Sequence, residues 1–202
     1  MTTLLQQLAD ARTDTNPCNA TIDGEMLASY KPPSSAPMGW GVSSAEISEC
    51  GTYRYWLKRD AECSPDRGTA LFCMLNPSTA DATQDDPTIR RLRGYAKAWR
   101  ANGLIVVNLY ALRSTDPRAL KTHADPVGPL NDYWMRTLVR ECGDVLCAWG
   151  KNADRSRVRD ALKLFSQEGA RLFALDFSKD GTPKHPLYLR GDLIPQRWEP
   201  KP

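Results

Sequence analysis

The chain has 202 residues, of which 41% are hydrophobic and 25% charged, the composition of a globular protein long enough to bury a sizeable core. No apolar run reaches the ~20 residues of a membrane-spanning helix. The first residues, MTTLLQQLADARTD, lack the basic start and long apolar stretch of a secretory signal. We therefore expect a cytoplasmic protein with no membrane partner.

The net charge of +3 is unevenly distributed along the chain. Residues 1–50 carry 2 Lys/Arg and 6 Asp/Glu, a balance of −4, whereas residues 51–202 carry 25 and 18, a balance of +7. A basic main body permits a polyanionic partner without requiring one.

Six cysteines raise the question of disulfides or a metal site, but no pair has CxxC spacing. Cys73, Cys142 and Cys147 lie in apolar stretches, where cysteine usually packs as a small hydrophobic residue. This usage favours a reducing compartment and buried structural thiols.

The chain is predicted to divide at about residue 50. Residues 1–50 form an irregular, proline-rich lead-in with a short helix over residues 3–11, and residues 51–202 form a single α/β domain. The domain begins with TYRYWLKR, whose alternation predicts an edge strand.

Strands and helices then alternate. TALFCML predicts a buried strand ending at Leu75, and Asp85-Asp86-Pro87 predicts a helix start, because a carboxylate caps and proline suits the first turn. That helix ends at Asn102-Gly103. The strands LIVVNLY, DVLCAWG and RLFALDF follow, with helices over residues 131–141 and 154–167. The pattern predicts a three-layer α/β/α sandwich with a mainly parallel, four-stranded central sheet.

Polar residues follow each of the four predicted strands, over residues 76–81, 108–116, 149–152 and 180–186. The carboxyl ends of parallel strands meet at one edge of a sheet, which is where such folds bind ligands. We therefore expect the binding site at this edge.

Three side chains there have two interpretations each. Asn76 precedes a proline, so its amide either points into the site or closes an Asx turn. Asn108 ends an apolar strand and either bonds loop backbone or reads the edge of a base. His185 is a loop residue or a catalytic group, and His123 lies in a polar loop without a predicted role.

A basic stripe lies beside the apolar face of the helix after Pro87 and consists of Arg90, Arg93, Lys97 and Arg100. Their spacing of three, four and three places them on one side of the helix. Such a stripe is either a solvated face or a phosphate-binding one.

The segments MLNPSTADATQDDPTIRR, VVNLYALRSTDP, DPVGPLND, AWG and HPLYL resemble a bacterial and phage family described as a domain of unknown function. The resemblance covers about residues 52–198 and implies no activity. The order and chemistry of the same segments are also similar to the uracil-DNA glycosylase superfamily.

The similarity to that superfamily depends on four motifs. Leu75-Asn76-Pro77-Ser78 resembles an Ile-Asn-Pro-Gly motif of the mismatch-specific branch, in which the Asn activates the attacking water. Val107-Asn108 resembles a strand end that reads the pyrimidine edge, and Trp149-Gly150 resembles the end of a later strand. His185-Pro186 resembles a His-Pro-Ser motif that places the histidine on the base O2 beside a leucine wedge, here Leu187 or Leu189.

The chain departs from the superfamily at two positions. Leu187 stands where the motif has serine, and Asn76 stands where the best-known branch has an aspartate. The cysteine spacing of its iron–sulfur branches is missing. The resemblance is therefore stronger for the fold than for uracil as the substrate.

The resemblance implies a DNA glycosylase that hydrolyses the N-glycosidic bond of a flipped pyrimidine, natural or modified. Asn76 would orient water at C1′, with Asp81 as an alternative general base, and His185 would donate to the base O2. Asn108 would read the base edge.

The remaining roles concern stacking and phosphate binding. Tyr110 or Trp149 would stack on the base, and the basic stripe would bind phosphates together with Arg113 and Lys184. Neither a metal nor a cofactor is needed.

Two other functions remain open from the sequence. One is a module that binds nucleic acid or a modified base without catalysis. The other is an enzyme acting on free nucleosides or nucleotides, which need no duplex wedge.

Overall fold

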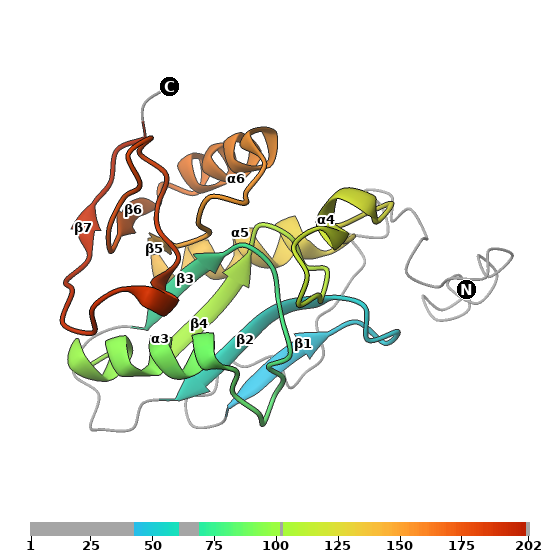
Figure 1. Cartoon of the computed structure of the whole chain (residues 1–202), viewed down its shortest axis with the longest axis horizontal. Helices are drawn as coiled ribbons and strands as arrows, with labels where there is room; N and C mark the ends of the chain where they lie inside the picture. Colours follow the sequence, from blue (N-terminus) through green and yellow to red (C-terminus); the bar gives the residue numbers. More distant parts are fainter. Residues whose placement is uncertain (1–42, 61–68, 102, 201–202) are drawn as a thin grey trace, which may run out of the picture.

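A mixed sheet of seven strands, in the order β1-β2-β4-β3-β5-β6-β7, organises the chain (Figure 1). The structure, a computed structural model, describes residues 43–60, 69–101 and 103–200, so the helix expected over residues 3–11 lies outside the described residues. The strands are β1 (Ser44–Ile47), β2 (Arg54–Asp60), β3 (Ala70–Met74), β4 (Gly103–Asn108), β5 (Asp144–Cys147), β6 (Arg171–Ala174) and β7 (Gln196–Arg197).

The expectation of a mainly parallel sheet of four strands is wrong. β4, β3, β5 and β6 run parallel at the centre, but β2 pairs antiparallel with β4, β1 with β2, and β7 with β6. The strand β2 is not an edge strand, because β1 covers it. β1 comes from the range expected to be an irregular lead-in, where its four residues give no lasting alternation.

Helices cover both faces of the sheet, as in a three-layer arrangement. They are α3 (Pro87–Ala98), α4 (Ala119–Thr122), α5 (Asn131–Cys142) and α6 (Arg155–Gln167), followed by the short 3₁₀ helix η2 (Pro186–Tyr188). In Figure 1, α3 lies in front of the sheet and α5 behind it. Successive residues of β3 alternate between the layers: Leu71 and Cys73 pack in the cluster with α5 and α6, and Phe72 and Met74 in the cluster with α3.

The chain reverses its direction of travel across the sheet between β3 and β5. It passes from β3 through α3 to β4 on one side, and then returns through α5, on the opposite face, to β5 on the other side of β3. In open α/β sheets, ligands bind beyond the carboxyl ends of the strands at such a switch point. The ends of β3 and β5 therefore mark the place to look for a site.

The start of α3 confirms a local prediction. Asp86 is the N-cap and accepts a hydrogen bond from the backbone N–H of Ile89 at 2.8 Å, and Pro87 opens the first turn. The predicted end is wrong, because the left-handed residue after the helix is Arg100, at φ 59°, and Gly103 already belongs to β4.

The cysteines expected to pack as small hydrophobic residues do so. Cys73 and Cys147 face each other in the register of β3 and β5, and both are buried free thiols. Burial raises the pKa of Cys73 to about 12, so the thiol stays protonated and unreactive.

Candidate functional site

Four segments meet at the edge of the sheet where the parallel strands end, here called the carboxyl edge: residues 75–86, 108–114, 148–153 and 175–188. Backbone hydrogen bonds join them. Tyr110 donates to Leu75 (3.0 Å), Ser114 to Pro77 (2.9 Å), and Gly150 to Pro183 (3.0 Å), in each case from N–H to the carbonyl oxygen. The convergence expected from the sequence is thus present.

Asn76 is held in one orientation. Its Nδ2 donates to the backbone carbonyl oxygens of Ser114 (2.8 Å), Pro77 (3.0 Å) and Leu112 (3.4 Å). Three acceptors on one side of the amide fix which end is NH₂. The Oδ1 atom accepts no hydrogen bond within the described residues and is left as an oriented acceptor.

His185 is a half-buried histidine with a fixed tautomer. Its Nδ1 accepts from the backbone N–H of Leu187 at 3.3 Å, so the neutral ring carries its proton on Nε2. Burial lowers its pKa, while the charge of Asp86 acts in the opposite direction. At neutral pH the side chain is a neutral hydrogen-bond donor.

Gly150 brings the loop after β5 against His185. The glycine has φ +74°, and a Cβ at that position would lie 3.2 Å from the His185 Cβ. A larger residue would be strained there and would also displace the histidine. The Ala148 N–H donates to the Cys73 carbonyl across β5 and β3, so the loop that contacts His185 leaves the sheet beside the strand that precedes Asn76.

The pKa of His185 provides a first prediction. In Asp86→Asn, the side-chain oxygen still caps α3 but the negative charge is gone, so the His185 pKa falls further below 6.5. NMR titration of the imidazole signals measures this. Because the folded pKa lies below the unfolded value, the unfolded state binds the proton first, and stability falls as pH drops through about 6.5.

The control for that titration is Asp144→Asn. Asp144 begins β5 at the opposite end of the sheet and forms an exposed pair with Arg171. The His185 pKa should be unchanged in this variant. An equal shift in both variants, or none in Asp86→Asn, would contradict the assigned electrostatic link.

Asn108 is the last residue of β4 and stands opposite Met74 in the register with β3. It is only 1% exposed, and its Nδ2 has no hydrogen-bond partner within the described residues. Its backbone oxygen accepts from the side chain of Asn131 at 3.0 Å. A buried amide donor without a partner costs ~1–3 kcal/mol, so Nδ2 is an unsatisfied donor at the end of β4.

Tyr110 and Trp149, the predicted stacking residues, are covered in the structure. Both belong to the core cluster with α5 and α6, and Trp149 is 2% exposed with its ring edge-on to Trp198 at 5.7 Å. Burial raises the pKa of Tyr110, whose hydroxyl meets the backbone of Asp154. The two rings therefore form part of the wall of the site, and little of either ring is exposed.

Asp81 closes a turn in the loop after β3. Its Oδ1 accepts from the backbone N–H groups of Thr83 and Gln84, both at 2.8 Å. These bonds lower its pKa, so the carboxylate is ionised at neutral pH but is a weakened base. Oδ2 remains without a partner within the described residues.

Arg59 shapes the same loop from β2. Its guanidinium pairs with Asp85 at 2.6 Å and donates to the carbonyl oxygens of Asp81 (2.5 Å) and Gln84 (3.1 Å). The side chain is 2% exposed. Nothing in the sequence singled it out, because its partners lie 22–26 residues away.

The basic stripe of α3 is not gathered at the carboxyl edge. Arg90 lies in the first turn and donates to the Asp85 carbonyl oxygen at 2.6 Å, and Arg93 pairs with the Asp85 carboxylate at 2.9 Å. Lys97 and Arg100 lie toward the opposite end of the sheet, since α3 runs from the end of β3 to the start of β4. The stripe therefore extends away from the site.

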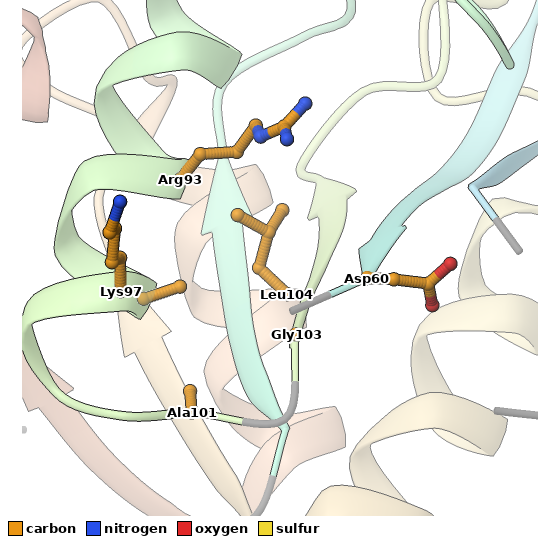
Figure 2. Close-up of a pocket in the computed structure, with 7 residues that line it drawn as sticks. Asp60, Arg93, Lys97, Ala101, Gly103 and Leu104 are labelled. Carbon is orange, nitrogen blue, oxygen red and sulfur yellow. The ribbon is translucent and has the colours of Figure 1, made fainter. Parts of the chain in front are cut away.

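Figure 2 shows Arg93 and Lys97 beside the start of β4 and Asp60 at the end of β2. The cavity between them measures about 10 Å³, room for a single water. This cavity itself is too small for a phosphate group.

The other predicted phosphate ligands are partly occupied. Arg113 donates to the Gly51 carbonyl oxygen at 3.1 Å, and Lys184 pairs with Asp176 at 2.7 Å. Leu187 is half-buried in η2. The exposed apolar side chain next to His185 is Tyr188, at 91% exposure, which the sequence analysis did not single out.

Arg54 is a second charged residue that the sequence analysis missed. It is 2% exposed, donates to the Ala80 carbonyl oxygen at 2.6 Å, and its Nε has no partner within the described residues. Burial lowers its pKa to about 10, and Asp86 raises it. The alternation in TYRYWLKR predicted only an edge strand, and the contact of Arg54 with the loop after β3 is a tertiary feature that the alternation does not report.

A large groove lies beside the carboxyl edge, along α6. Its volume is about 1010 Å³, and it runs between the loop after β5, the first half of α6, the segment after β6 and the C-terminal residues 198–200. Four chain segments form it, so no single motif indicates it.

Residues 43–60, 69–101 and 103–200 were searched for metal-binding clusters and for membrane-spanning helices. No group of three or more His, Cys, Asp or Glu side chains there is arranged to hold a metal ion. No helix in the same ranges combines the length and apolar character needed to cross a bilayer.

Comparison with known proteins adds a family without a known activity. No curated protein and no solved structure matches the chain. The family described as Protein of unknown function (DUF1643) matches residues 54–187, from the start of β2 into η2, and thus includes all of the carboxyl-edge segments except residue 188. With two thirds of its length matched, the chain belongs to the DUF1643 family.

Proposed function

We propose that the carboxyl edge binds a pyrimidine base flipped out of DNA and hydrolyses its N-glycosidic bond. The observation that carries the proposal is the fixed orientation of two groups beside the switch point. Asn76 offers an acceptor, Oδ1, and His185 offers a donor, Nε2–H. Hydrolysis at C1′ needs both: an acceptor to orient water and a donor for the charge that develops on the base.

The reaction would proceed by attack of water on C1′ as the bond to the base nitrogen breaks. Asn76 orients this water, and the base leaves with the bonding electron pair. His185 stabilises the negative charge on the base O2 with a neutral N–H donor. The water proton passes to solvent or to the free Oδ2 of Asp81, the base takes up a proton, and the sugar keeps the hydroxyl.

Asn108 supports the pyrimidine as the target. Its Nδ2 is buried and has no partner within the described residues, so a carbonyl of the base would satisfy it. The similarity to the uracil-DNA glycosylase superfamily implies the same role for this asparagine.

A non-catalytic binding module is the second candidate, favoured by a specific observation. An amide cannot accept the water proton, and the hydrogen bonds at Asp81 lower its pKa and weaken it as a base. Such a module would bind nucleic acid through the same groups and release no base.

The test compares a deoxyuridine mononucleotide with a uracil-containing oligonucleotide at equal concentration, and adds oligonucleotides with 5-substituted uracils. The proposal predicts free base and an abasic site from an oligonucleotide and no reaction of the mononucleotide. Reaction of the mononucleotide alone indicates an enzyme of free nucleotides. Salt-sensitive binding without base release indicates the binding module.

We propose Tyr188 as the side chain that fills the gap left by the flipped base. It follows His185 by three residues and is 91% exposed, whereas Leu189 packs against the core beside α3. Stacking of one base on an aromatic ring is worth ~1–3 kcal/mol, so we expect Tyr188→Ala to slow base release from a duplex about tenfold. Release from a single strand should change little.

Ile194→Ala is the control for Tyr188→Ala. Ile194 is also a large exposed apolar residue, at 75%, and follows Leu193, which accepts from the Trp99 indole on α3. It should leave both rates unchanged. Equal losses on duplex and single strand in Tyr188→Ala would contradict the wedge role.

A further inference from the structure

The groove along α6, called the α6 groove here, carries an excess of positive charge. Four basic side chains line it, Lys151, Arg155, Arg159 and Lys179, against the two carboxylates of Asp180 and Glu199. All four basic residues are exposed, and none forms a close ion pair or a hydrogen bond within the described residues; at longer range, Arg155 interacts electrostatically with Asp180 and Arg159 with Asp154.

Elsewhere on the described surface, arginines are mostly paired. Arg118 pairs with Asp116, Arg171 with Asp144, and Arg190 with Asp192. Unpaired cations that gather in one concave surface favour an anionic ligand. Lys163 extends the row, since it lies two helical turns beyond Arg155 on α6.

The groove also has aromatic and apolar walls. Trp198 and Phe177 are half-buried and pack against each other at 6.1 Å between ring centroids, and Val158 and Leu162 line the α6 side. Half-exposed rings give flat surfaces on which bases stack irrespective of sequence. Charge and stacking surfaces together are typical of single-strand binding sites.

One end of the groove reaches the carboxyl edge. Lys151 directly follows Gly150, the glycine in contact with His185, and Pro183 lines the groove two residues before the histidine. The Gly150 N–H donates to the Pro183 carbonyl at 3.0 Å, which ties the two walls together. A strand lying in the groove would lead directly to the site.

We propose that the α6 groove binds the single-stranded segment of a polynucleotide that flanks the target nucleotide. Its volume of about 1010 Å³ is at the upper limit of small-ligand pockets, ~300–1,000 Å³, so it has room for more than one nucleotide. The inference rests on the proposed function only for the position of the target base. Binding itself requires no catalysis.

The test measures binding of a fluorescein-labelled single strand of twelve thymidines by anisotropy at several salt concentrations. The groove variant is Lys151→Gln, Arg155→Gln, Arg159→Gln and Lys179→Gln combined. Each phosphate contact with a single strand contributes ~0.7 to the slope of log K against log salt, so we expect the slope to fall by about 3. At near-physiological salt concentration, the affinity of the groove variant for the strand should be more than about tenfold lower than that of wild type.

The matched control removes the same charge from the surface outside the groove, by combining Arg118→Gln, Lys121→Gln, Arg140→Gln and Arg171→Gln. Thermal unfolding confirms that both variants fold. The slope of log K against log salt should stay close to the wild-type value in the control variant. Equal losses in the two variants, or an unchanged groove variant, would overturn the proposal.

Two competitors define the ligand class. The first competitor is a twelve-residue polyglutamate. If it displaces the strand at equal charge, the proposal is overturned in favour of an acidic peptide. The second is a DNA duplex, and tighter binding of the duplex would overturn the proposal in favour of double-stranded DNA. Base release is measured separately on the same variants. If release is never seen but the groove variant loses binding, the proposed function fails and the groove proposal stands.

Discussion

Replacing His185 by alanine should slow base release by about 10²–10³, the usual effect of removing one donor to a developing negative charge. The loss should be in kcat, because the charge on the base O2 develops only in the transition state. Single-turnover kinetics on the oligonucleotide that wild-type protein cleaves measures it. Affinity for that oligonucleotide should change little.

His123→Ala is the matched control. The Nδ1 of His123 accepts from the backbone N–H of Asp125, two residues ahead, at 3.1 Å, as the Nδ1 of His185 does from Leu187. Both variants therefore lose the same local contact, and only one loses a group at the switch point. A comparable rate loss in His123→Ala, or none in His185→Ala, would contradict the donor role.

Replacing Arg59 by methionine should lower the free energy of unfolding by about 2–4 kcal/mol, because the mostly buried Asp85 carboxylate keeps only Arg93 as an ion-pair partner and buried carbonyl oxygens lose their donor. Arg59 is 2% exposed and Asp85 is 14% exposed, so water compensates little. The carbonyl oxygens of Asp81 and Gln84 lose their donor as well. Urea unfolding followed by tryptophan fluorescence gives the value.

Arg171→Met provides the comparison for Arg59→Met. Arg171 pairs with Asp144 at the same distance, 2.6 Å, but the two side chains are 63% and 43% exposed. Exposed pairs contribute ~0–1 kcal/mol, so the variant should unfold close to wild type. Similar losses of unfolding free energy in the two variants would show that burial does not increase the contribution of the Arg59–Asp85 pair to stability.

Local signals in the sequence predicted the elements that depend on local structure. Asp86 and Pro87 begin α3 where expected, because capping and proline geometry act within one turn. The parallel strands at the centre were found because they are continuous apolar runs, buried on both faces. β1 and β7 were missed because four and two residues carry no period, and only pairing makes them strands.

The candidate site was predicted in part, for a similar reason. The position of Asn76 and His185 after strands placed both residues at the carboxyl edge, as the structure shows. The basic stripe has the predicted spacing on α3, but the direction of the helix takes Lys97 and Arg100 away from that edge. The spacing of residues along a helix shows which of them lie on the same face of the helix. It does not show how the helix is oriented relative to the sheet.

Long-range contacts account for the residues that the sequence analysis missed. Arg54 and Arg59 act on a loop more than 20 residues away, and the α6 groove combines four separate segments. Tyr188 is distinguished from its leucine neighbours by exposure alone. Each of these features depends on tertiary packing, which alternation and motif spacing do not report.

The most direct test of the account is whether the pure protein releases a base from DNA. Oligonucleotides containing uracil or 5-substituted uracils would be incubated with wild-type protein and with His185→Ala, and free bases and abasic sites measured by mass spectrometry. The account predicts one released pyrimidine, matched by abasic sites, and its loss in His185→Ala. Equal release by both proteins, or no release by folded wild-type protein that binds the oligonucleotides, would contradict it.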